Sequence, residues 1–311
     1  MNKILQNTNY LCRNFTGSIK EFKFDELVEY NYYINIFQHI KQLLGCEFNN
    51  YEFLFYSKII QHGEVSDDEI IPDKNNPHFV VFYISDETGS VPHKLASRSK
   101  SVFKVYLKKH SEGNVYYFPL GYANGEGLYP KPMRERTNNV FFIGQLNRSR
   151  IKFYKELTGL TFIPDNILLG FKRLLPSDLS KKFEKSKIVF TSGFMAGLNR
   201  ESYNEMLYNS KIIICPYGSV TYETFRHYEA MRAGCVIITL KMPLVRSFDG
   251  APIIQLESWD QIWKSINNLL QDENKLEALS RKTLDWWEEK CSEKSVAEYV
   301  VEKIKNHDFI Q

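Results

Sequence analysis

The chain has 311 residues, enough for two domains of ordinary size with separate cores. Its 40 Lys and Arg against 37 Asp and Glu leave a formal net charge of only +3 without a long basic run, which argues against nucleic acid as a partner. No apolar stretch of about 18 residues is present to span a bilayer, and the five cysteines form no CxxC pair. This cysteine usage indicates a reduced compartment, so we expect a cytoplasmic protein.

The first part of the chain alternates helical and strand patterns. Apolar residues at helical spacing predict a helix at about 24–44, and a strand is expected at 51–60. Residues 78–84, HFVVFYI, form the continuous apolar run that is typical of a buried parallel strand. Two further strands are expected at 102–106 and 115–120. Strands separated by helices predict an α/β layer.

Two carboxylates follow the strand at 78–84 directly. Asp86 and Glu87 are expected at its carboxyl end, where either could take a proton from a bound group. Because they are adjacent, they cannot both point at one atom, and we favour Asp86. A half-buried carboxylate near another has a raised pKa, which suits a base. His93, in the same loop, is the alternative base or a contact for the acceptor, although a lone loop histidine is more often an incidental surface residue.

A junction between domains is expected at 120–137, where three glycines and two prolines gather. We place a first Rossmann-like domain at 1–128 and a second at 129–289. A C-terminal helix at about 290–311 is expected to pack back on the first domain. The second domain is expected to contain parallel strands at 139–145, 188–191, 212–215 and 236–240.

Ligands of open parallel sheets bind outside the carboxyl ends of the strands. In the second domain, the strand at 139–145 contains Gly144 and is followed by Arg150, while Arg148 could take the place of Arg150. The loop after the strand at 188–191 carries Phe194, which could stack on a nucleobase. Tyr217 has the same potential, but both aromatic residues could equally belong to the core.

Residues 215–240, CPYGSVTYETFRHYEAMRAGCVIITL, read as a strand end, a turn, a helix and another strand. Backbone N–H groups at such a helix start, with an arginine one turn in, suit a diphosphate. The alternative is that Glu223, Arg226 and Glu229 form a ladder of ion pairs on the surface. The other candidate donor contacts of this segment are Tyr217, Gly218, Ser219, Thr221 and Glu223, the last of which could face the sugar.

The pattern GxxTxxTxRxxEAxxAGCVxI within this segment resembles the donor-binding segment of the exostosin-like glycosyltransferases. The resemblance is close over about 25 residues and looser over 79–254, and it implies the GT-B fold, in which two Rossmann-like α/β domains face a central cleft. By the resemblance, Arg226 contacts the donor diphosphate, Glu229 holds the ribose hydroxyls and Gly144 with Arg150 match a Gly-x₅-Arg pattern. Phe225 stands where the family has Ser or Thr.

The resemblance implies an inverting glycosyltransferase that moves a sugar from a nucleoside diphosphate sugar, such as a UDP-linked sugar or UDP-xylose, to a glycan acceptor. No Asp-x-Asp motif is present, so we expect no required metal and no other cofactor. A non-catalytic relative that binds nucleotide sugar or glycan remains an alternative. A Rossmann oxidoreductase is the weakest alternative, because no Gly-x-Gly-x-x-Gly follows a strand.

Overall fold

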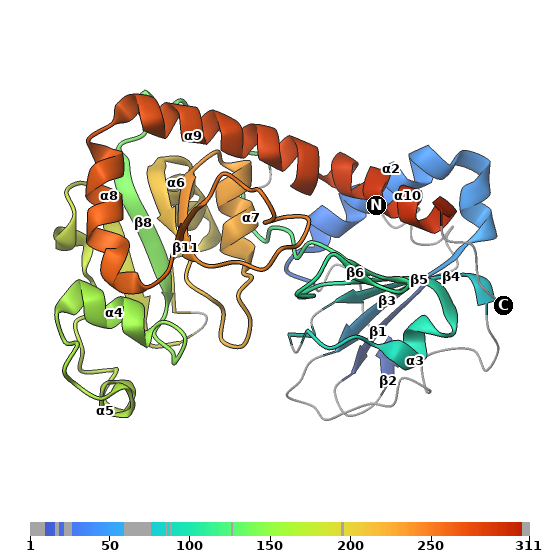
Figure 1. Cartoon of the computed structure of the whole chain (residues 1–311), viewed down its shortest axis with the longest axis horizontal. Helices are drawn as coiled ribbons and strands as arrows, with labels where there is room; N and C mark the ends of the chain where they lie inside the picture. The colour runs from blue at the N-terminus through green and yellow to red at the C-terminus, as the bar shows by residue number, and fades with distance from the viewer. Residues whose placement is uncertain are drawn as a thin grey trace. The chain divides into compact units, whose positions relative to one another are not determined.

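The computed structural model describes residues 10–15, 19–21, 27–58, 76–84, 86–87, 89–125, 127–193 and 196–306. The chain divides into two compact units, and Figure 1 labels most of their α-helices and many of their strands. The first unit comprises Met1–Ala123, Pro243–Asp249 and Glu288–Gln311. The second comprises Asn124–Met242 and Gly250–Trp287.

The first unit is built on a seven-stranded sheet within its described residues. Its strands are β1 (Tyr10–Phe15), β2 (Ile19–Glu21), β3 (Glu52–Lys58), β4 (Asn76–Ile84), β5 (Ser99–Lys104), β6 (Ser111–Glu112) and β7 (Val115–Tyr117). Its helices are α2 (Tyr30–Leu44), the 3-10 helix η2 (Gly45–Asn50), α3 (His93–Ala96) and α10 (Glu293–Asn306), with the π-helical turn η8 (Trp287–Cys291) before α10. The strand order is β2-β1-β3-β4-β5-β7-β6. Neighbouring strands from β1 to β7 are parallel, and the short outer strands β2 and β6 pair antiparallel.

Aromatic side chains fill the core of the first unit. Phe55, Phe82 and Phe103 come from three adjacent strands, and their rings stack with centroids 4.8 and 5.3 Å apart. Phe37 of α2 packs on Phe55 at 5.0 Å, which places α2 over this sheet. Helix α10 packs against α2. The many phenylalanines of the sequence therefore serve largely as packing groups here.

The second unit contains a five-stranded sheet in which each neighbouring pair is parallel, in the order β12-β11-β10-β8-β9. Its strands are β8 (Asn138–Gln145), β9 (Lys187–Thr191), β10 (Ser210–Ile214), β11 (Val236–Leu240) and β12 (Ile254–Leu256). Its α-helices are α4 (Ile151–Thr158), α5 (Asp165–Gly170), α6 (Arg200–Tyr208), α7 (Phe225–Arg232), α8 (Ile262–Leu270) and α9 (Glu273–Trp286). Three 3-10 helices are η5 (Met133–Glu135), η6 (Ser180–Lys182) and η7 (Trp259–Gln261).

The end of α7 shows how closely the helices of the second unit approach one another. Gly234 follows α7 with a φ of 62°, a left-handed conformation that favours glycine. A Cβ atom at this position would lie 2.8 Å from Cγ of Leu284 in α9. Ser280 of α9 also donates to the Gly234 carbonyl at 2.7 Å. Glycine at this position therefore ends α7 and lets α9 pack against it.

The predicted fold class of two α/β domains built on parallel sheets is confirmed, and the continuous apolar runs at 78–84 and 139–145 are strands β4 and β8. Strands β1, β2, β6 and β12 were not predicted, and β6 has only two residues. The residues of β1, YLCRNF, include polar positions, and β2 and β12 have only three residues each, so none gives a long apolar run. The division into units falls after Ala123, and the segment Pro243–Asp249 also belongs to the first unit.

Among the described residues, no helix has the length and apolar character needed to cross a lipid bilayer.

Candidate functional site

Two arginines meet at the carboxyl end of β8, in the second unit. A Cβ atom built on Gly144 would lie 2.8 Å from Nη1 of Arg150 and 3.3 Å from Nη2 of Arg226. Both guanidinium groups therefore occupy the space directly beside the Gly144 backbone. Arg150 reaches it from the start of α4, and Arg226 from the first turn of α7. We call Arg150 and Arg226 the two-arginine cluster.

An aromatic ring supports both members of the cluster. The guanidinium carbon of Arg226 lies 4.9 Å from the ring centroid of Phe142, and that of Arg150 lies 6.0 Å from it. Phe142 is fully buried in β8. The ring face stabilises positive charge without neutralising it, so Phe142 holds the cluster in place and leaves its net charge available.

The cluster is only partly satisfied by the protein. Each guanidinium has five N–H donors. Arg150 donates from Nε to the Tyr217 carbonyl and from Nη1 to the Gln145 carbonyl, both at 3.1 Å, and Arg226 donates from Nη2 to the Ile143 carbonyl. Nε of Arg226 is buried and has no hydrogen-bond partner among the described residues. No carboxylate of the described residues pairs with either arginine.

A structural arginine of the same unit provides a contrast. Arg136 is 3% exposed and donates from all three of its nitrogens, to the carbonyls of Lys131, Ser210 and Ala233 and to Sγ of Cys235. Arg136 therefore links these segments of the chain, and hydrogen-bond acceptors surround its positive charge. The two-arginine cluster lacks this saturation, so its N–H donors and its charge are available to an anion.

Electrostatics supports this interpretation. Burial, followed by the nearby charge of Arg226, lowers the pKa of Arg150 to about 9. A lowered pKa means that the positive charge is unfavourable where it stands. An anion between the two guanidinium groups would offset this unfavourable free energy, so the site favours binding of a negatively charged group.

The start of α7 is fixed by a buried histidine. The Thr224 N–H donates to Nδ1 of His227 at 3.2 Å, and Nε2 of His227 lies 3.3 Å from Oγ1 of Thr239 in β11. Burial lowers the pKa of His227 to about 3, so this residue is neutral at physiological pH. His227 therefore positions the helix start, and the helix dipole adds partial positive charge beside the cluster.

The loop before α7 closes on itself and on the loop after β8. The Gly218 N–H donates to the Thr221 carbonyl at 2.7 Å, and Oγ1 of Thr221 donates to the Glu223 carbonyl at 3.2 Å. Ser219 accepts from Nδ2 of Asn147 at 3.1 Å. The Tyr217 carbonyl faces Arg150, while its hydroxyl donates to the Lys241 carbonyl. Of these sequence-predicted residues, Tyr217 contacts the two-arginine cluster directly. The hydrogen bonds of Gly218, Ser219 and Thr221 are with other groups of the protein.

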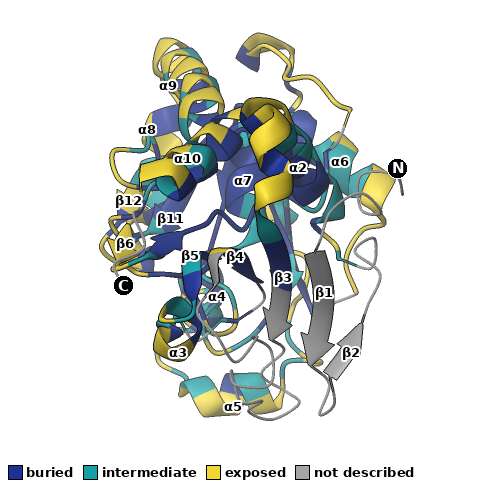
Figure 2. Ribbon diagram, turned by 90° about the vertical axis from the view of Figure 1, so that its right-hand side faces the viewer, coloured by how far each residue is buried: buried dark blue, intermediate teal, exposed yellow. Residues whose placement is uncertain are grey.

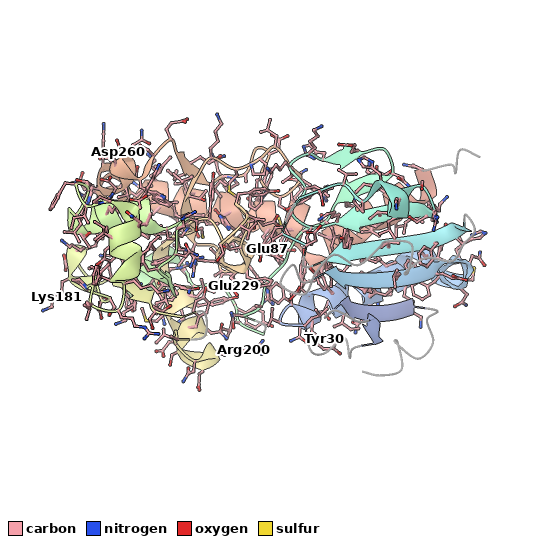
Figure 3. The ribbon with its side chains drawn as sticks, turned by 90° about the horizontal axis from the view of Figure 1, so that it is seen from below. Tyr30, Glu87, Lys181, Arg200, Glu229 and Asp260 are labelled. Atoms are coloured by element: carbon pink, nitrogen blue, oxygen red, sulfur yellow. The ribbon has the colours of Figure 1, made fainter. Side chains whose placement is uncertain are left out.

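The two glutamates of this segment are buried. Glu229 is 2% exposed and accepts from the Tyr203 hydroxyl at 2.7 Å and from Nδ2 of Asn124 at 2.8 Å, within the second unit that Figure 3 shows with its side chains. Glu223, also 2% exposed, accepts from the Tyr228 hydroxyl. Neither pairs with Arg226, so the alternative of a surface ion-pair ladder is excluded.

The structure removes Asp86 from the candidate bases. Its carboxylate is fully buried in the first unit and forms an ion pair of 3.1 Å with Nζ of Lys104, which is also fully buried. Lys104 donates in addition to the carbonyls of Asp86 and Val105. A carboxylate held in this way has no exposed atom to meet an acceptor hydroxyl. The preference for Asp86 over Glu87 is corrected accordingly.

The side chains of Glu87 and His93 are accessible to solvent, in contrast to that of Asp86. Glu87 is half-buried, and burial followed by the charge of Asp86 raises its pKa. His93 stands at the start of α3 with its side chain 76% exposed, and its Nε2 lies 3.8 Å from Glu112. The exposure of His93 fits the surface alternative better than a site residue, so Glu87 is the remaining candidate base.

Several site residues were not predicted. Phe142, Asn147 and Tyr203 lie in or beside elements with no sequence pattern that separates them from core residues. Phe194 lies outside the described residues. Within the described part of the chain, no group of three or more His, Cys, Asp or Glu side chains is placed to hold a metal ion.

No model of a protein family matches this chain, and no curated protein matches it. The resemblance to the exostosin-like family therefore stays a prediction.

Solved structures do resemble the chain. A structure of an alpha-glucosyltransferase in complex with UDP-glucose and DNA containing an abasic site is 13% identical, with a TM-score of 0.51 over 88% of this chain and 84% of that one. An alpha-glucosyltransferase in complex with UDP and a 13-mer DNA containing a HMU base is 12% identical, with a TM-score of 0.52 over 86% and 83%. An alpha1,3-fucosyltransferase is 11% identical, with a TM-score of 0.50 over 98% and 94%.

The exclusion of nucleic acid as a partner is corrected by these structures, because two of the similar proteins are in complex with DNA. A net charge near zero and the lack of a nucleic-acid motif are therefore no ground for that exclusion on this fold. At 11 to 13% identity, the likeness establishes the architecture alone: the chain has the mixed α/β fold with two parallel-sheet units that is found in GT-B glycosyltransferases.

Proposed function

We propose that this chain is a glycosyltransferase that takes a sugar from a nucleoside diphosphate sugar, most simply a UDP-linked one, and transfers it to an acceptor hydroxyl. The observation that carries the proposal is the two-arginine cluster, in which two guanidinium groups converge beside Gly144 and have no carboxylate partner within the described part of the chain. The shared fold with enzymes whose structures hold UDP or UDP-glucose adds support.

The cluster suits a departing diphosphate for a chemical reason. Glycosyl transfer breaks the bond between the anomeric carbon and a phosphate oxygen, so negative charge grows on the leaving group. Arg150 and Arg226 are planar donors that can bind phosphate oxygens in a bidentate manner. Because the protein already holds them in place over Phe142, they need little reorganisation as the charge develops.

We assign the other roles as follows. Glu229 contacts the ribose of the donor, for which Tyr203 and Asn124 hold its carboxylate in position. Glu87 takes the proton from the acceptor hydroxyl in an inverting reaction. The charge compensation by two arginines makes a divalent metal unnecessary, and unchanged transfer in the presence of EDTA is the expected outcome.

The experiment that tests the proposal has two stages. A thermal shift screen of nucleotide sugars identifies the donor, because a ligand at about 100 times its Kd stabilises by roughly 2.7 kcal/mol. Transfer from that donor is then followed with oligosaccharide acceptors and with DNA carrying an HMU base, and NMR of the product gives the anomeric configuration. Donor binding without transfer to any acceptor would favour the non-catalytic alternative, and no response to any nucleotide sugar would contradict the proposal.

The pH dependence of transfer should report on Glu87. A base acts in its ionised form, and burial raises the pKa of Glu87 above its ordinary value. The rate should therefore fall as the pH drops through this raised pKa. Glu87→Gln should lose about 10²- to 10⁴-fold in kcat and retain its affinity for UDP, whereas Glu47→Gln, an exposed glutamate of the same unit, should behave as wild type. Full activity of Glu87→Gln would remove this assignment.

A methyl group at Gly144 should disturb the cluster without unfolding the protein. In Gly144→Ala, the new Cβ lies 2.8 Å from Nη1 of Arg150 and 3.2 Å from Cζ of Phe142, so the flexible end of Arg150 has to move. We expect about tenfold weaker UDP binding, the order of one lost charged hydrogen bond. Gly170→Ala is the control, because a Cβ there meets no atom within 4 Å. Equal UDP affinity of both variants would contradict the proposed position of the diphosphate.

A further inference from the structure

An apolar and basic surface lies on the connection from α4 to β9. Four large apolar side chains of this connection face solvent. They are Phe162 (79% exposed), Ile167 (47%), Phe171 (60%) and Leu174 (81%). Figure 2 colours much of α5, the helix that contains Ile167, as exposed. We call these four residues the apolar patch.

The patch is held by a structured segment. Leu168 is 2% exposed, and Ile163, Leu169 and Leu175 pack against the core of the second unit. The backbone continues in helical turns, with the Phe171 N–H bonded to the Ile167 carbonyl and the Leu174 N–H to the Phe171 carbonyl. One side of the segment is therefore anchored in the core, and the spacing of Ile167, Phe171 and Leu174 places them together on the other side.

Positive charge accompanies the patch. Residues 161–187 contain six Lys and Arg against three Asp and Glu, an excess equal to the net charge of +3 of the whole chain. Two of the acids are already neutralised, Asp165 by Lys155 at 2.8 Å and Asp178 by Lys187 at 3.0 Å. Four bases form no ion pair with any described residue: Lys172, Arg173, Lys181 and Lys182. Figure 3 shows Lys181 at the periphery of the second unit.

We infer that this surface docks the protein on a membrane that contains anionic lipids. Exposed aromatic and aliphatic side chains on a short helical segment can enter the boundary between headgroups and acyl chains, while adjacent Lys and Arg meet anionic headgroups. A nucleic acid would match the charge and could stack on the phenylalanines, but it offers nothing apolar to Ile167 and Leu174. A clustered exposed apolar surface also needs a partner on general grounds.

Vesicle sedimentation tests this inference with the whole chain. The protein should sediment with vesicles of phosphatidylglycerol and phosphatidylcholine in equal amounts, and much less with phosphatidylcholine alone. Phe171→Glu with Leu174→Glu should abolish sedimentation. Lys172→Gln with Arg173→Gln should weaken it by about 30-fold, because each basic residue near an anionic surface contributes about fivefold. Phe171, Arg173 and Leu174 are exposed and Lys172 is half-buried without an ion pair to a described residue. Both double variants should therefore keep the thermal stability and the UDP affinity of wild type.

Matched controls separate the patch from general effects. Leu244→Glu with Tyr129→Glu introduces the same charge at exposed apolar residues elsewhere, and Lys264→Gln with Lys282→Gln removes two exposed bases; both should sediment as wild type. Equal sedimentation of all variants, or no sedimentation of wild type, would overturn the inference. The inference would also be overturned if wild type bound no vesicles and the Phe171→Glu, Leu174→Glu variant instead lost binding to DNA or lost self-association.

Discussion

Replacing Arg226 by alanine is expected to weaken UDP binding by about 10- to 100-fold, the effect of losing hydrogen bonds from a charged group to phosphate. The reason lies in its position, since its guanidinium stands over Phe142 with a buried Nε that has no partner among the described residues. Arg226→Lys should recover little, because an ammonium group cannot make the planar bidentate contact. Isothermal titration with UDP at constant ionic strength measures both variants.

Arg150→Ala should weaken UDP binding to a similar extent. The double variant with Arg226→Ala should lose less than the sum of the two free energies, because the two guanidinium groups act on one diphosphate. Arg148→Ala is the control, since Arg148 is exposed and should leave the affinity within about threefold. Unchanged UDP affinity in both Arg150→Ala and Arg226→Ala would sink the proposed donor site, and with it the proposed function.

Replacing Lys104 by alanine is expected to destabilise the first unit by about 3–5 kcal/mol, because it leaves the buried carboxylate of Asp86 without its counter-ion. Both side chains have no exposed surface, and Lys104 also satisfies the carbonyls of Asp86 and Val105. Thermal and urea denaturation of the variant measure this loss. Lys187→Ala is the control, since its ion pair with Asp178 is exposed and should contribute less than about 1 kcal/mol.

Variants of the Asp86–Lys104 ion pair distinguish a structural role of Asp86 from a catalytic role. Asp86→Asn should lower the stability of the protein, while the fraction that remains folded should transfer sugar at the wild-type rate. A folded Asp86→Asn protein with normal stability and no transfer would restore Asp86 as the base. A Lys104→Ala protein as stable as wild type would show that the buried pair does not support the fold.

Part of the candidate site could be predicted because it depends on local sequence. Gly144 lies at the end of a strand, and Arg150 and Arg226 lie at helix starts. Such positions can be predicted because an apolar run that ends at a glycine or a capping residue is visible in the sequence. The parallel strands β4, β8, β10 and β11 were recognisable for the same reason, since both faces of such strands are apolar.

The sequence by itself determined the α/β class, the principal strands and the arginines at the carboxyl end of the second sheet. Only the tertiary structure decided which charged groups are already paired. Asp86 is bound by Lys104, 18 residues away, and Glu229 by Asn124, 105 residues away, while Arg150 and Arg226 meet no carboxylate among the described residues. Local sequence patterns place a side chain on a helix or strand. Its partners come from elements distant in the sequence, which only folding brings into contact. These partners decide whether a charged side chain stabilises the fold or stays available to bind a ligand.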